Sequence, residues 1–148
     1  MSSTVPIVFV EIRVFAHATE DEEKVLAAAR SLLPPEFVEK VVVKKTNQTG
    51  HHGNPITLFE TRIKEKSVVK ALLEKLGSGL SSLDKENLCN EITQHLDKGK
   101  FYIRLDKQSA FLGEFKLGSS DPMHLRIQFK TSKLEEIVNV CKRFGMLP

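Results

Sequence analysis

The sequence predicts an α+β protein in which mainly antiparallel sheet is covered by helices. Three observations lead to this fold class. Short segments alternate apolar and polar residues as half-buried strands do, the segments between them carry apolar stripes at helical spacing, and the C-terminal strand segments are joined by short links. The expected order is βαββα followed by αβββα. The sequence leaves open whether these two halves share one sheet.

The N-terminal half begins with strong alternation. Val8, Val10 and Ile12 share one face of the first segment, and Glu11 and Arg13 share the other. A capping box of Thr19 and Glu22 predicts the start of the helix that follows. The expected elements are a strand over 7–17, a helix ending at Pro34, strands over 40–46 and 56–64, and a helix over 67–77.

The C-terminal half is predicted to hold three strands between two helices. A second capping box, Ser132 with Glu135, predicts the start of the last helix. The expected elements are a helix over 84–97, strands over 101–106, 110–117 and 123–130, and a final helix. No Pro-rich or Ser-rich linker separates the halves, so we expect one domain over residues 1–148, with any subdivision near 78–83.

Composition narrows the class of protein. The 148 residues include 22 Lys and Arg against 19 Asp and Glu, a formal charge of +3, which permits a nucleic-acid partner without requiring one. The longest uncharged apolar run, 5–10, is far shorter than the ~20 residues of a membrane span. The two cysteines, Cys89 and Cys141, are far apart in sequence. We therefore expect a cytoplasmic protein with reduced thiols and no membrane partner.

Motifs for catalysis or metal binding are not found. The sequence has no Gly-x-Ser-x-Gly, and its Gly77-Ser78-Gly79 follows a helix instead of opening one. The histidines lack the spacing of a metal site. We expect no catalytic residue, metal or cofactor, and keep a nuclease or phosphodiesterase that uses His51 or His52 as a third hypothesis.

Two groups of residues are candidates for contact with RNA phosphates. The first surrounds the unusual loop Gly50–Pro55, because pairing of the flanking strands as a hairpin would gather cations there. It comprises Lys44, Lys45, His51, His52, Asn54, Arg62 and Lys64. The second follows the polar faces and links of the C-terminal strands and comprises Tyr102, Arg104, Lys107, Lys116 and Arg126. For both groups, an ordinary solvated surface is the alternative interpretation.

Four blocks of sequence resemble a known family. They are residues 13–20 (RVFAHATE), 50–55 (GHHGNP), 105–114 (LDKQSAFLGE) and Asp121-Pro122. Together they resemble an archaeal family of predicted RNA-binding proteins that is labelled a predicted exosome subunit. The resemblance implies a fold like the double-stranded-RNA-binding domain in the C-terminal half, and a link to RNA processing or ribosome assembly.

The leading hypothesis is a non-enzymatic archaeal RNA-associated protein. It would act as an accessory factor in exosome-linked RNA processing or in ribosome biogenesis, with RNA and RNA-processing or ribosome-assembly proteins as partners. The alternative is a protein-interaction or dimerisation module that has the fold of an RNA-binding protein and does not bind RNA. The sequence does not settle whether an exposed edge strand pairs two copies as a homodimer.

Overall fold

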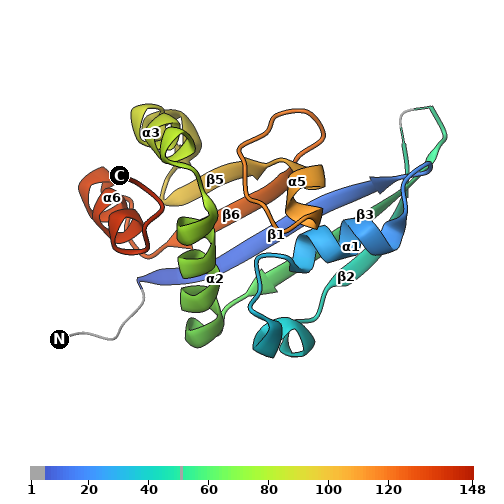
Figure 1. Ribbon diagram of the computed structural model, residues 1–148, viewed down its shortest axis with the longest axis horizontal. Coiled ribbons are helices and arrows are strands. Elements are labelled where there is room, and N and C mark those ends of the chain that lie inside the picture. The colour runs from blue at the N-terminus through green and yellow to red at the C-terminus, as the bar shows by residue number, and fades with distance from the viewer. Residues whose placement is uncertain (1–5, 51) are drawn as a thin grey trace.

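A computed structural model describes residues 6–50 and 52–148 (Figure 1). Its strands are β1 (Ile7–His17), β2 (Lys44–Thr49), β3 (Pro55–Ile63), β4 (Leu96–Asp97), β5 (Lys100–Leu105) and β6 (Met123–Phe129). Its helices are α1 (Glu22–Arg30), the 3-10 helix η1 (Pro35–Lys40), α2 (Lys66–Gly79), α3 (Ser82–Asn90), α4 (Ile92–His95), α5 (Lys107–Phe111) and α6 (Leu134–Arg143). Within the described ranges, none of these helices has the length and apolar content to cross a membrane.

All six strands belong to one antiparallel sheet in the order β2-β3-β1-β6-β5-β4. The 11-residue β1 is the long central strand, hydrogen-bonded to β3 on one side and to β6 on the other. The two halves of the chain therefore share one sheet, and the predicted α+β class with antiparallel sheet covered by helices is confirmed. Because β6 pairs with β1 as well as with β5, the C-terminal half has no sheet of its own, and its likeness to a double-stranded-RNA-binding domain is not confirmed.

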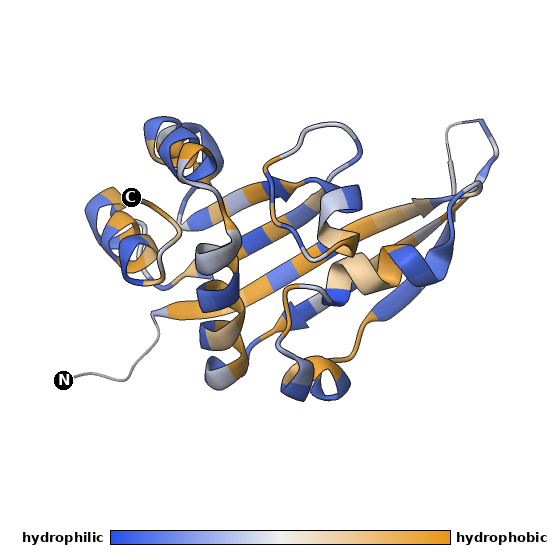
Figure 2. Ribbon diagram, viewed as in Figure 1, coloured by the Kyte–Doolittle hydropathy of each residue, from blue (hydrophilic) through white to orange (hydrophobic). Residues whose placement is uncertain are grey.

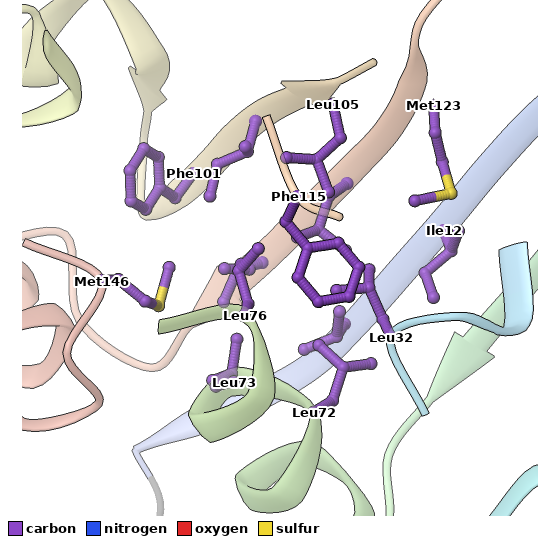
Figure 3. Close-up of a cluster of buried hydrophobic side chains, with 14 of the residues drawn as sticks. Ile12, Leu32, Leu72, Leu73, Leu76, Phe101, Leu105, Phe115, Met123 and Met146 are labelled. Carbon is purple, nitrogen blue, oxygen red and sulfur yellow. The ribbon is translucent and has the colours of Figure 1, made fainter. Parts of the chain in front are cut away.

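The helices lie on one face of the sheet, and α1, α2 and α5 cross in front of the strands in Figure 1. Apolar side chains from the strands and helices meet between them in one buried cluster. Figure 3 shows the Phe115 ring within this cluster, among Leu72, Leu76 and Leu105. The strand segments contrast in hydropathy: β1 is mainly apolar, whereas the edge strand β2 is hydrophilic (Figure 2).

A β-bulge near the start of β1 changes which residues face the core. Ile7 pairs with Phe129 and Phe9 pairs with the adjacent Gln128, so that Val8 is an extra residue on this strand. Ile7 joins the core cluster under the helices, while Phe9 shares the face of Gln128 on the other side of the sheet. The bulge therefore explains why both Ile7 and Phe9 are buried although they are two residues apart.

The predicted strand over 110–117 is wrong, because the short helix α5 occupies its first part. Asp106 accepts hydrogen bonds from the Ser109 backbone N–H at 2.9 Å and from the Ser109 hydroxyl at 2.6 Å, which starts the helix. These two hydrogen bonds also hold the pKa of Asp106 below its usual value. Gly113, with φ at +80°, follows the helix. Among the described residues, one isolated β-bridge, between Leu117 and Leu105, joins the rest of this segment to the sheet.

Other boundaries differ from the predictions in smaller ways. The second strand begins later, at Lys44, and the predicted helix over 84–97 is divided into α3 and α4, followed by the unpredicted two-residue β4. Both predicted capping boxes are wrong. Asp21 caps α1 through the Glu23 backbone N–H, and α6 begins after Lys133 without a side-chain cap. In each case the helix begins one or two residues later than the capping-box pattern places it.

Gly77 in α2 allows the closest approach between this helix and the end of the chain. A Cβ atom at this position would lie 2.0 Å from the carbonyl oxygen of Phe144 and 2.9 Å from the carbonyl carbon of Gly145. Both neighbours are backbone atoms, so they cannot move aside as the end of a flexible side chain can. The contact therefore requires glycine in spite of its low helix propensity.

We expect Gly77→Ala to lower the free energy of unfolding by about 1–3 kcal/mol, because the added methyl group overpacks the contact with Phe144. Urea unfolding followed by circular dichroism measures this. The matched control is Ser78→Ala, one residue along the same helix at an exposed position. An alanine at residue 77 that leaves stability unchanged or raises it would show that the α2 to Phe144 contact is not tight.

Candidate nucleic-acid interface

The face of the sheet opposite the helices is lined by charged and polar side chains, and we call it the open face. Strand alternation and cross-strand pairing identify its members. They include Glu11, Arg13, Phe15, Lys44, Glu60, Arg62, Lys100, Tyr102, Arg104, His124, Arg126 and Gln128. The cations on this face outnumber its carboxylates, Glu11, Glu60 and Asp97 (which pairs with Lys100), so the open face is basic although the whole chain carries only +3.

One carboxylate is shared by two of the arginines. Glu11 accepts from Arg62 and from Arg126, each at 3.0 Å, and its side chain is only 13% exposed. Both guanidinium groups also lie over the ring of Phe9, at 4.3 Å for Arg62 and 5.5 Å for Arg126. This arrangement fixes the two arginines on the sheet, so their positive charge is presented from a rigid position.

Beside this cluster the open face has a hollow of about 240 Å³ formed by β1, β5 and β6. Its charged and ring-bearing side chains are Glu11, Arg13, Phe15, Tyr102, Arg104, His124 and Arg126. Arg104 makes no ion pair among the described residues, and Arg13 has only a 3.5 Å contact with Glu60. The hollow therefore has two arginines with charge available for a ligand.

His124 lies between these two arginines, because it pairs with Arg13 of β1 and with Arg104 of β5. Burial lowers the pKa of His124, and the positive charges of Arg104 and Arg13 lower it further, while Asp121 acts weakly in the opposite direction. The imidazole is therefore neutral at pH 7 and can donate one N–H. An anion in the hollow would meet two guanidinium groups and this donor.

Five of the residues singled out in the sequence lie on the open face: Lys44, Arg62, Tyr102, Arg104 and Arg126. Others lie elsewhere. Lys45 points to the helix side, where its Nζ is 2.7 Å from Glu22 of α1. Lys116 lies in the loop after α5, 3.6 Å from Glu114.

The predicted hairpin of β2 and β3 is confirmed, but its cations do not surround the loop. Lys44 pairs with Glu60, five residues along β2 from the Thr49–Pro55 pair that borders the loop, which is roughly 16 Å. Arg62 lies still further along β3, and Lys64 directly follows the end of that strand. The loop itself is at the end of the sheet away from α3 and α6 (Figure 1), with His52 and Asn54 exposed, and His51 lies outside the described residues.

Lys107 is buried, only 3% exposed, and makes a network that joins distant parts of the chain. Its ammonium group donates to the Phe15 carbonyl at 2.9 Å, to Glu20 at 2.8 Å, and to the carboxylate of Asp121. His17 Nε2 lies 3.0 Å from the other oxygen of Asp121. Three of the four sequence blocks that carry the family resemblance thus meet at one ammonium group, which is committed to these partners and cannot contact RNA phosphates.

The same network includes three side chains with the composition of a metal site. The ligand atoms of His17, Glu20 and Asp121 all lie within 4.8 Å of one another. However, the Lys107 ammonium group is already bonded to both carboxylates. We interpret the network as a structural ion cluster in which the Lys107 ammonium group takes the position that a metal ion would occupy.

The sequence analysis did not single out Arg13, Lys100 and His124 as site residues. The alternation in 7–17 placed Arg13 on the polar face of its strand, and the alternation in 123–130 does the same for His124. What the sequence does not reveal is that β1 and β6 are neighbours. Only this pairing brings Arg13 beside His124.

The fold and the open face define a class of protein: a single antiparallel sheet with helices on one face and a basic surface on the other. Comparison with known proteins agrees with this class. The chain belongs to the family described as RNA binding, whose model matches residues 9–130.

Three similar proteins illustrate the family. The chain is 39% identical over 140 residues to the RNA-binding protein PAB1135 of Pyrococcus abyssi, covering 91% of each chain. It is similar in structure to AF2318 of Archaeglobus fulgidus, with a TM-score of 0.78 and 28% identity over 93% of this chain and 99% of that one. It is also similar to Mth689 of Methanothermobacter thermautotrophicus, with a TM-score of 0.74 and 26% identity over 96% and 98% of the two chains. All three relatives are archaeal.

We expect Lys107→Met to lower the free energy of unfolding at pH 7 by about 2 kcal/mol, because it removes charged hydrogen bonds from Glu20 and Asp121. Lys70→Met, at an exposed position of α2, should change stability by less than about 0.5 kcal/mol. Urea unfolding measures both.

The effect of Lys107→Met should depend on pH. Burial raises the pKa of Asp121, but hydrogen bonds and charge from Lys107 and His17 lower it more, so the net pKa lies below its usual value. A carboxylate of this kind stabilises the fold above its unfolded pKa of about 3.9, and this stabilisation is lost as the pH falls through the lower folded value. The difference between wild type and Lys107→Met should therefore shrink at acid pH. A difference that stays constant from pH 7 to pH 2 would contradict the assignment.

Proposed function

We propose that this protein binds RNA through the open face of its sheet, mainly by contacts to the sugar-phosphate backbone. The observation that carries the proposal is an uncovered sheet face on which cations outnumber carboxylates. Most hydrogen bonds between proteins and nucleic acids go to phosphate and sugar, and arginine and lysine make many of them. The family description agrees with this function.

The role we propose is that of an accessory factor without catalytic activity of its own, in exosome-linked RNA processing or in ribosome biogenesis in the archaeal cytoplasm. The family is named for RNA binding and not for a reaction. The proposed partners are RNA and the proteins of these assemblies. Lys44, Arg62, Arg104 and Arg126 are the proposed phosphate contacts among the residues singled out in the sequence, to which we add Arg13 and Lys100.

Self-association through β2 has less support. A strand at the edge of a sheet can pair with a second copy, but charged side chains, lysine above all, oppose such pairing. The exposed edge strand β2 begins with Lys44 and Lys45 and is hydrophilic along its length (Figure 2). We therefore favour RNA over a second copy of the chain as the partner.

Replacing three open-face cations should weaken RNA binding and reduce its dependence on salt. The triple variant Lys44→Gln, Lys100→Gln, Arg104→Gln removes charges that make no ion pair among the described residues, so the fold should be retained. Because each lost phosphate contact lowers the slope of log affinity against log salt by roughly 0.7–0.9, the slope should fall by about 2. Fluorescence anisotropy with a labelled RNA hairpin at several salt concentrations measures this.

The matched control is Lys66→Gln, Lys70→Gln, Lys142→Gln. These three exposed residues belong to α2 and α6, so the variant has the same net charge as the first and leaves the open face intact. Equal effects of the two variants would mean that only net charge matters and would contradict an interface on the open face. If wild type binds no RNA even at low salt, the proposed function is wrong.

A further inference from the structure

The open face combines an exposed aromatic ring with an anion-binding hollow. Tyr102 is 39% exposed and stands on β5 directly opposite Arg126 of β6. Arg104 follows two residues along the same face of β5. The ring and the two available arginines of the hollow therefore lie within neighbouring positions of three adjacent strands, about 10 Å across.

We propose that the hollow binds one unpaired nucleotide of a single-stranded RNA, with its base stacked on Tyr102 and its phosphate between Arg13, Arg104 and His124. This inference rests on the proposed function and names the class of RNA that the open face binds.

Size and shape favour an unpaired nucleotide. The hollow of about 240 Å³ is smaller than the roughly 300–1,000 Å³ of typical small-molecule pockets, so it suits one phosphate with its sugar while the base lies against the Tyr102 ring that lines it. A base can stack on a side chain only when its own face is uncovered, which occurs in single strands, loops and ends. A base inside a duplex is stacked on both faces by its neighbours.

Charge in the hollow favours a phosphate. Arg104 belongs to β5 and Arg13 to β1, and the acid whose charge raises the pKa of His124 is Asp121, in the loop before β6. Asp121 is already bonded to Lys107 and His17. Glu11 at the rim is bonded to Arg62 and Arg126. Glu60 lies 3.5 Å from Arg13. The carboxylates near the hollow thus each have a partner of their own, the charge of Arg104 remains for the ligand, and Arg13 is held only by this one long contact.

The first experiment compares two RNA probes by fluorescence anisotropy, a labelled ten-nucleotide oligouridylate and a blunt RNA duplex of twelve base pairs. Wild type should bind the oligouridylate more tightly. Tyr102→Leu should weaken oligouridylate binding at least fivefold, because stacking on an aromatic ring contributes about 1–3 kcal/mol per base. Tyr102→Phe, which keeps the ring, should remain within twofold of wild type, and neither variant should change duplex binding.

Two results would overturn the inference while leaving the proposed function in place. In the first, Tyr102→Leu binds the oligouridylate as tightly as wild type does, or loses no more affinity for it than for the duplex. In the second, wild type binds the duplex more tightly than the oligouridylate. In both cases the triple variant of open-face cations would still weaken binding, which separates this failure from failure of the proposed function.

A second measurement uses the unmodified protein. The pKa of His124 is followed by NMR with and without saturating oligouridylate. A phosphate beside the imidazole would stabilise its protonated form and oppose the effect of Arg13 and Arg104, so the pKa should rise on binding. A pKa that stays the same or falls would show that no phosphate enters the hollow.

Discussion

The pairing of β1 with both β3 and β6 is the constraint on which the rest of the structure depends. It joins the N-terminal hairpin to the C-terminal strands and makes one sheet from segments that are more than 100 residues apart in sequence. Because β1 has neighbours on both sides, its alternation decides which residues of the five other strands share a face. The division of the molecule into a covered face and an open face follows from this one strand.

The two faces of β1 have different chemistry for this reason. Toward the helices, Val10, Ile12 and Val14 are fully or almost fully buried. Toward the other side, Glu11 connects the arginines of β3 and β6, and Arg13 lies beside His124. The basic surface is therefore assembled across strands from both halves of the chain, and neither half contains it alone. A modest total charge is compatible with a basic face because the carboxylates are concentrated elsewhere or paired.

Local patterns in the sequence predicted the fold class, and long-range pairing is where they failed. Alternation over 7–17 and 123–130 identified β1 and β6, because each strand has one buried face. The segment 110–117 has a similar pattern, yet Asp106 starts a helix there and Phe115 turns into the core from a loop. The sequence also did not predict that Lys107 is buried in an ion network, since its partners come from residues 15–20 and 121. Of the candidate site, the polar strand faces were predictable, whereas the neighbours that make them a site were not.

The bulge at Val8 has a consequence for how this chain can change in evolution. Val8 is the extra residue opposite the Phe129–Gln128 pair, and it is exposed. Loss of one residue here would place Ile7 opposite Phe129 in regular pairing, still beneath the helices, and Phe9 would keep its place under the arginines. Elsewhere in β1 the loss of a single residue would exchange the two faces of the strand. The start of β1 is thus a position at which members of this family can differ in length without any change to the core or to the basic surface.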